Sequence, residues 1–274
     1  MKLIDFDKHF QKYAQGWIRD NRSRYKNMDE IEEEIPELYM RWLNQPADFI
    51  DGATPGDYFA RFDSVDELIG LLRAYHAQGV PVPDMLLETI SARGEEAVPA
   101  LMAVAAEGGD PALTVTALNL LIEIGSDEPM ELCLNLVAGA KERDEAADVA
   151  AELLQNLGVR VVEPILSRMD GCPDAAQDAF LDVLCNFPGD ERIYNYVIDA
   201  FMTRPDRRAL YASYLGKLGD ERAVDTLKAA LDQSDLNYLD YIEIVNAIEA
   251  LGGEVDTTRN WDGDPYYESL RKMQ

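Results

Sequence analysis

Apolar residues recur at three- and four-residue intervals along most of the chain, and glycine ends these apolar segments at a nearly constant spacing. The intervals are 31, 33, 31, 30 and 33 residues, between Gly94, Gly125, Gly158, Gly189, Gly219 and Gly252. Each interval holds two segments with helical periodicity. A repeat of about 20 to 50 residues built from two helices is typical of an α-solenoid. The sequence therefore predicts an all-α fold: a right-handed α-α superhelix of stacked helix pairs, with an irregular helical region at its start.

One four-residue motif occurs twice at this interval. Gly189-Asp190-Glu191-Arg192 recurs as Gly219-Asp220-Glu221-Arg222. Glycine ends helices readily because it adopts the left-handed conformation without a Cβ clash, and aspartate often caps the helix that follows. We therefore interpret the motif as a turn and a helix cap. On this interpretation, Gly219→Val destabilises the fold more than Gly263→Val, which lies in the tail.

The pattern divides the chain into three regions. Residues 1–63 form an N-terminal helical cap region, residues 64–253 form six helix pairs, and residues 254–274 form a linker and a C-terminal capping helix. In the first region we expect a helix over 5–20 with an aromatic face, a second helix from about 27 to 43, and a loop. Thr54-Pro55 predicts a short helical turn in that loop, and Ser64 predicts the N-cap of the first repeat. Asp264-Pro265 predicts the start of the closing helix.

Several motifs connect these repeats to a known family. The run Gly219-Asp220-Glu221-Arg222-Ala223-Val224-Asp225-Thr226-Leu227 resembles the HEAT-like repeats of the phycobilin-lyase type, and the segments around Pro99 and Pro164 are similar to them. The resemblance covers roughly residues 94–253 and implies a HEAT-like fold. It implies no single activity, because this repeat class serves lyase subunits, DNA-repair proteins and adaptors.

The net charge of the chain limits the classes of partner that we expect. The sequence has 52 acidic and 25 basic residues, which give a net charge of −27. Such a surface repels phosphate groups, so we expect neither nucleic acid nor an anionic membrane as a partner. A basic protein or peptide is compatible with it. The same acidity also serves a simpler purpose, since net charge keeps a protein soluble.

The residues that catalysis and metal binding use most are scarce. Cysteine occurs three times, without a CxxC pair, and histidine twice, so we expect no metal site, no cofactor and no enzymatic activity. No apolar run approaches the roughly 20 residues that span a bilayer, and the first residues do not resemble a signal peptide. These features predict a cytoplasmic protein.

The second helices of the pairs supply the candidate site, because in helical solenoids they usually line the concave face. Aligning them on their terminal glycines gives a column of polar residues. Asp148 with Glu152, and Asp178 with Asp182, are four residues apart and share a helix face, which predicts an acidic strip. Four tyrosines of the last repeats are expected to add aromatic contact area. The candidate partner-binding residues are Asn119, Glu123, Asp148, Glu152, Asn156, Asp178, Asp182, Asn186, Tyr211, Tyr214, Lys217, Tyr238, Tyr241 and Asn246.

These features favour an interaction scaffold or adaptor that holds a protein or peptide segment in an acidic concave groove. Two other functions stay open: an accessory lyase or chaperone-like subunit that acts on a cofactor-bearing protein, and a nucleic-acid-binding HEAT protein. The second would need a basic groove, which the polar column does not provide. A purely structural interpretation is also open, because any solvated helix face carries polar residues and tyrosines at helical spacing often belong to the core.

Overall fold

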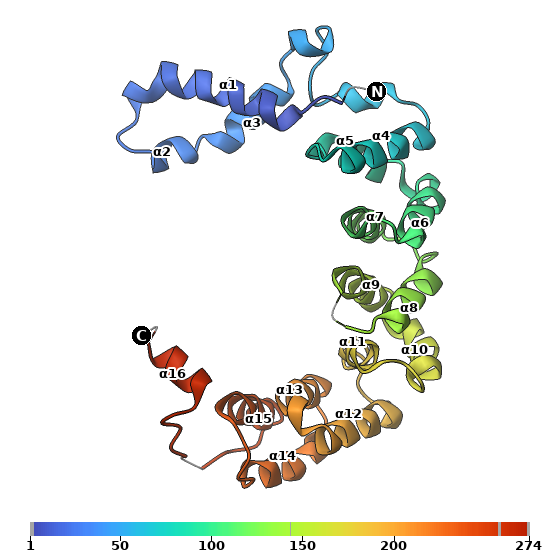
Figure 1. Ribbon diagram of the computed structural model, residues 1–274, viewed down its shortest axis with the longest axis vertical. Coiled ribbons are helices and arrows are strands. Elements are labelled where there is room, and N and C mark those ends of the chain that lie inside the picture. Colours follow the sequence, from blue (N-terminus) through green and yellow to red (C-terminus); the bar gives the residue numbers. More distant parts are fainter. Residues whose placement is uncertain (1–2, 143, 257–258, 273–274) are drawn as a thin grey trace. The chain divides into compact units, whose positions relative to one another are not determined.

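The computed structural model describes residues 3–142, 144–256 and 259–272, and these residues form helices joined by turns, without a β-strand. The chain consists of two compact units, Met1–Leu132 and Cys133–Gln274. Figure 1 shows the order of the helices within each unit. The predicted all-α fold is confirmed.

The first unit begins with helices held together by aromatic rings. Helix α1 (Phe6–Asn21) packs on α3 (Ile35–Leu43), and the short α2 (Asp29–Glu32) precedes α3. The expectation of one continuous helix over 27–43 was wrong, because α2 ends at Glu32 and a new helix starts at Ile35. Pro36 explains the interruption, since proline lacks an N–H and fits only the first turn of a helix.

The loop that follows contains two short 3-10 turns, Asp48–Ile50 and Tyr58–Arg61. Thr54 makes the capping contact that the sequence predicts, because its hydroxyl oxygen accepts a hydrogen bond from the backbone N–H of Asp57 at 3.4 Å. The same hydroxyl donates to the Asp57 carboxylate at 2.7 Å, and the 3-10 turn that follows begins at Tyr58. Phe59 is fully buried and lies against the Phe6 ring. The aromatic side chains therefore anchor the loop.

The remaining helices of the first unit are arranged in pairs. Ser64 is the N-cap of α4, as predicted, and accepts a hydrogen bond from the backbone N–H of Asp66 at 3.2 Å. Asp110 caps α7 in the same way. Arg73 of α4 and Glu107 of α6 form an ion pair between successive pairs. The helices are α4 (Val65–Gln78), α5 (Asp84–Ser91), α6 (Val98–Glu107) and α7 (Pro111–Ile124).

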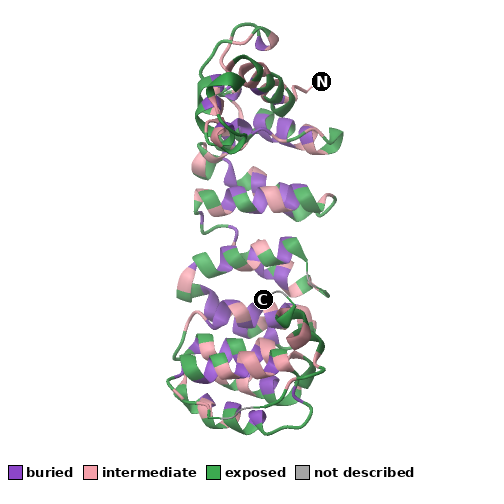
Figure 2. Ribbon diagram, turned by 90° about the vertical axis from the view of Figure 1, so that its left-hand side faces the viewer, coloured by how far each residue is buried: buried purple, intermediate pink, exposed green. Residues whose placement is uncertain are grey.

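The second unit continues the pattern of helix pairs. Figure 2 shows buried positions along its stacked helices, with exposed positions in the turns and on the outer faces. Fully buried residues such as Leu154, Ile165 and Phe180 form the apolar layers between helices. The helices are α8 (Met130–Gly139), which starts just before this unit, α9 (Glu145–Asn156), α10 (Val162–Met169), α11 (Asp174–Leu184), α12 (Glu191–Thr203), α13 (Arg208–Leu218), α14 (Val224–Leu231), α15 (Tyr238–Ala250) and α16 (Pro265–Arg271).

The glycines that set the repeat interval all have the expected conformation. The six residues from Gly94 to Gly252 have φ between 58° and 100°, in the left-handed region. Gly263 has φ of 93°, so it too is a left-handed glycine. The expectation that Gly263 tolerates valine better than Gly219 therefore loses its basis, because both backbones disfavour a side chain.

The closing helix α16 forms as predicted. The Asp264 carboxylate accepts hydrogen bonds from the backbone N–H groups of Tyr266 and Tyr267 at 2.9 and 3.1 Å. Its other oxygen accepts from the N–H of Tyr238 at 3.0 Å, at the start of α15. These hydrogen bonds hold the pKa of Asp264 below its usual range. One carboxylate therefore caps α16 and attaches it to α15.

Candidate partner-binding cleft

A cleft with a volume of about 690 Å³ lies among α9, α11, α13 and the residues Ala140, Lys141, Glu142 and Asp144, entirely within the second unit. Its base includes Ala147 and Ala151 of α9 and Ala175 and Ala179 of α11. Residues four apart share a helix face, so each helix presents two methyl groups to the cleft. Small side chains at these four positions leave the space that larger residues would fill.

Half of the non-alanine residues that line the cleft are acidic. Two cations, Lys141 and Arg207, also line the cleft, so the lining has a net negative charge. Such a surface attracts cations and repels anions. Asp148 and Glu152 are exposed and one turn apart on α9, as the sequence predicted. The acidic residues are Glu142, Asp144, Asp148, Glu152, Asp178 and Asp182.

Asp178 differs from the other acids because it is 8% exposed. The Tyr211 hydroxyl donates to its carboxylate at 2.6 Å, Arg207 forms an ion pair with it, and Arg204 lies 3.9 Å away. The expectation that Asp178 presents a charge to a partner therefore needs correction. Its carboxylate is neutralised inside the protein, because burying an unpaired charge would be costly.

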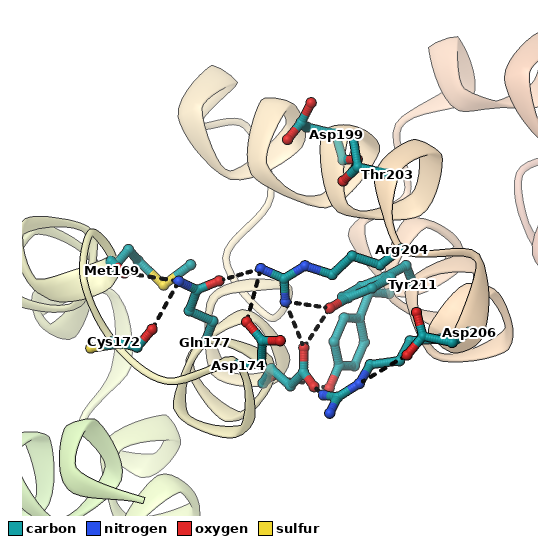
Figure 3. Close-up of polar contacts among 12 residues, drawn as sticks. Met169, Cys172, Asp174, Gln177, Asp199, Thr203, Arg204, Asp206 and Tyr211 are labelled. Atoms are coloured by element: carbon teal, nitrogen blue, oxygen red, sulfur yellow. Dashed lines mark hydrogen bonds and ion pairs between the residues drawn. The ribbon is translucent and has the colours of Figure 1, made fainter. Parts of the chain in front are cut away.

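A network of polar contacts extends from Asp178 along α11. Arg204 donates to the Gln177 side chain at 2.6 Å and to the Tyr211 hydroxyl at 3.0 Å, and it pairs with Asp174 at 3.4 Å. Gln177 in turn donates to the Cys172 carbonyl at 3.1 Å. Figure 3 shows these side chains joining α11 to α13 and to the segment before it. The network fixes the position of α13 against α11, and so the width of the cleft.

The residues at the C-terminal end of the predicted strip also make contacts within the protein. The Lys217 ammonium pairs with Asp182 at 2.8 Å, and Asn186 donates to the backbone carbonyls of Asp182 and Val183. The Gln155 side chain donates to the Asn186 amide oxygen at 3.2 Å. These contacts connect α9, α11 and α13, so this end of the strip contributes to helix packing.

The tyrosines do not form the exposed surface that the sequence suggested. Tyr211 is fully buried and Tyr214 is 7% exposed, with its hydroxyl donating to the Asp178 carbonyl at 3.1 Å. The Tyr238 and Tyr241 rings lie 5.4 and 5.0 Å from the Trp261 ring, in the contact between α15 and the closing segment. The expected aromatic contact area is therefore mainly interior, and only Tyr214 lines the cleft.

The structure brings five of the predicted residues to the cleft: Asp148, Glu152, Asp178, Asp182 and Tyr214. Others are exposed on α9, α13 or α15 outside the cleft lining, namely Asn156, Lys217 and Asn246. Asn119 and Glu123 are exposed on α7, in the first unit. Sequence reasoning missed Lys141, Glu142, Asp144, Arg207 and Leu210. The alanine pairs at a spacing of four are the feature of the sequence that could have indicated this open helix face.

The repeated Gly-Asp-Glu-Arg motif does more than the turn and cap that its sequence suggested. Arg222 pairs with Asp220 of its own copy and with Glu191 of the preceding copy, at 2.6 and 2.9 Å. Arg192 makes the same two kinds of pair, with Asp190 and Glu163. Hydrogen bonds from these arginines hold the pKa values of the four carboxylates below their usual ranges. The glutamate of one copy therefore links to the arginine of the next.

Two of the three thiols of the second unit are buried in apolar surroundings. Burial raises the pKa of Cys133 and of Cys185 to about 12, which disfavours the reactive thiolate. No group of three or more His, Cys, Asp or Glu residues is placed to hold a metal ion within the described ranges.

Among the residues that the structure describes, none of the helices combines the length and the apolar character needed to cross a membrane.

The comparison with protein families agrees with the geometry of the repeats. Residues 212–233 match the family model described as PBS lyase HEAT-like repeat. This segment runs from α13 through α14, including the second Gly-Asp-Glu-Arg copy. The chain is a HEAT-like repeat protein, and its helix pairs form a helical repeat scaffold. No curated protein matches the chain.

Proposed function

We propose that this protein is a non-catalytic binding scaffold, and that the cleft among α9, α11 and α13 holds a basic segment of a partner protein. One observation carries the proposal: acidic side chains surround a base of alanines in a cleft of about 690 Å³. Helical repeat proteins generally bind extended partners on such surfaces. The cleft volume is within the range of about 300–1,000 Å³ that is common for binding pockets.

The chemistry of the lining matches lysine and arginine. Their long aliphatic stems pack on apolar surface while their charged ends reach polar groups. Here the stems would lie on Ala147, Ala151 and Ala179, and the charged ends would reach Asp148 and Glu152 at the margin. Leu210 and Tyr214 provide an apolar boundary at α13. The cleft therefore suits a short segment in which basic residues alternate with small ones.

A non-catalytic role is supported by the composition of the cleft. Its described lining contains neither cysteine nor histidine, the residues most often used as nucleophile or base. The name of the matched family mentions a lyase, so the role of accessory subunit for a cofactor-bearing protein is the second candidate. An absorbance spectrum of the purified protein tests it, because a bound chromophore would add a band in the visible range.

The cleft proposal is tested with a labelled ten-residue lysine peptide and the full-length protein, by fluorescence anisotropy at low and high salt. The cleft variant carries Glu142→Gln, Asp148→Asn and Glu152→Gln. We expect this variant to bind the peptide roughly tenfold more weakly at low salt. The reason is that it loses three exposed charge pairs with the peptide, each of which contributes about 0.2–1 kcal/mol to binding. The difference should shrink at high salt, where exposed charges are screened.

A matched control separates the cleft from the net charge. Asp225→Asn, Asp232→Asn and Glu249→Gln change the charge of the full chain by the same amount at exposed positions outside the cleft. This control should retain an affinity within about twofold of the unsubstituted protein, if remote charges are largely screened. Equal losses in the two variants would show that only the overall charge attracts the peptide, and the cleft proposal would be rejected.

A further inference from the structure

A second groove, with a volume of about 540 Å³, lies in the first unit between α1 and the segment that contains Trp42 and residues 45–49. We name it the aromatic groove. Aromatic side chains make up much of its lining, and residues far apart along the chain supply them. They are His9, Tyr13 and Trp17 of α1, together with Trp42 and Phe49.

The rings of the aromatic groove are held by contacts beneath them. Trp42 is 4% exposed and packs against Phe10, with ring centres 5.4 Å apart. Phe49 lies parallel to Trp42 at 6.5 Å, and the His9 ring stacks on Phe49 at 3.7 Å. The aromatic face of α1 therefore divides in two: Phe6 is buried in the core, whereas Tyr13 and Trp17 are half-buried at the groove. These stacked contacts preorganise the binding surface, which reduces the entropy lost on binding.

Three polar groups of these rings have no hydrogen-bond partner among the residues that the structure describes. The indole N–H groups of Trp17 and Trp42 and the Tyr13 hydroxyl make no hydrogen bond to any described residue. Every fully buried side-chain nitrogen or oxygen of the described residues does have a partner. The Trp42 N–H must therefore keep contact with solvent although its ring is almost completely buried. A ligand that supplies hydrogen-bond acceptors would satisfy these donors.

The charges at the groove cancel. Lys12 and Asp20 are the two lining residues that carry a full charge at neutral pH, within a chain whose net charge is −27. A strongly basic or acidic segment would therefore find one complementary charge and one repulsive charge. The aromatic groove complements an uncharged segment instead, in contrast to the acidic cleft of the second unit.

We propose that the aromatic groove binds a proline-rich segment of a partner protein in the polyproline II conformation. This conformation has no internal hydrogen bonds, so its backbone carbonyls are available to Trp17, Trp42 and Tyr13. Proline rings pack on aromatic side chains, and aromatic-lined grooves are a recurring way to recognise such segments. An α-helical ligand fits less well, because its carbonyls already accept hydrogen bonds within the helix.

The binding experiment uses a labelled ten-residue proline peptide and the full-length protein, with a glycine-serine peptide of equal length as the control ligand. The protein carries Trp261→Phe, so that Trp17 and Trp42 are its two remaining tryptophans. We expect the proline peptide to raise the anisotropy and to shift the tryptophan emission, and the glycine-serine peptide to do neither. Equal binding of the two peptides, or no binding of either up to millimolar concentration, overturns the proposal.

Two substitutions locate the bound peptide. Trp17→Ala removes a central ring and should weaken binding by roughly 30-fold or more, as for other aromatic residues at the centre of interfaces. Tyr13→Phe keeps the ring and removes one donor, and should weaken binding by about fivefold. Gln15→Ala, at an exposed position of α1 outside the groove, is the matched control and should leave affinity unchanged.

Folding and self-association are checked with the same proteins. Circular dichroism shows whether each variant is folded. If Trp17→Ala is unfolded, the affinity of Tyr13→Phe tests the proposal, because this substitution removes only one oxygen atom. Sedimentation tests whether a second copy of this chain occupies the groove. A dimer that disappears in the Trp17→Ala variant would assign the groove to self-association and overturn the proposal. The three cleft substitutions of the second unit should not change proline-peptide binding, so the two proposals are tested independently.

Discussion

At the scale of single residues, the conformation of the backbone explains why particular positions carry glycine. Gly219 has φ of 75° at the end of α13, whereas Gly70 lies inside α4, is exposed and has nothing near its missing side chain. The repeated interval identified Gly219 as a helix end from the sequence alone. The sequence could not show that Gly263 has the same conformation, because that glycine belongs to no repeat.

The contrast between these two kinds of glycine gives a prediction. Gly219→Ala should lower the free energy of unfolding by about 1–2 kcal/mol, since the left-handed conformation penalises a Cβ. Gly70→Ala should raise it by about 0.5–1 kcal/mol, because alanine loses less entropy in a helix. Urea unfolding of both variants measures the two changes. Changes of the same sign would contradict the assigned conformations.

At the scale of helices, the sequence periodicity does not reveal how closely two helices pack. Helices α13 and α15 approach so closely at Gly216 that an added Cβ would lie 3.1 Å from the Ala247 Cα and 3.3 Å from its Cβ. Glycine has a low intrinsic helix propensity, so the sequence alone suggests that Gly216 destabilises α13. The structure shows that glycine permits the close contact. In the same way, burial of Tyr211 and Asp178 depends on how α13 meets α11, which no spacing within one helix predicts.

The contact at Gly216 is testable. Gly216→Val should destabilise the protein by about 1–3 kcal/mol, because α13 and α15 must move apart to admit the side chain. The control is Gly70→Val, which places the same side chain on an exposed helix face with open space around it. Thermal unfolding of the two variants should show a clear loss only for Gly216→Val. Similar melting temperatures would argue against close packing of α13 on α15.

At the scale of the whole molecule, the net charge of −27 is distributed among several kinds of carboxylate. Some line the cleft, and others pair with arginines between repeats. Arg222 lowers the pKa values of Asp220 and Glu191 by hydrogen bonding to both. A carboxyl group with a lowered pKa in the folded state favours folding above its unfolded pKa, near 4, and this contribution is lost as the pH falls through the folded value.

This linkage predicts how Arg222 contributes to stability at different pH values. Arg222→Met should lower the melting temperature at pH 7, and the difference from the unsubstituted protein should disappear as the pH is lowered from about 5 towards 2. Lys228→Met changes the net charge by the same amount, and it serves as the control because Lys228 is exposed on α14 and pairs with no carboxylate among the described residues. A difference for Arg222→Met that stays constant down to pH 2 would show that the ion pairs contribute nothing.

The sequence by itself determined the repeat. Glycine spacing, capping residues and apolar periodicity are local features, and they located the helices from Ser64 to the closing helix that Asp264 begins. It also placed Asp148 and Glu152 on one exposed face of α9, because that relation lies within a single helix. Which polar side chains stay exposed and which are buried or paired depends on the tertiary structure alone. It buried Asp178 and Tyr211, paired Glu191 with Arg222, and separated Phe6 in the core from Trp17 at the aromatic groove. These outcomes depend on contacts between residues distant along the chain, and local patterns do not contain that information.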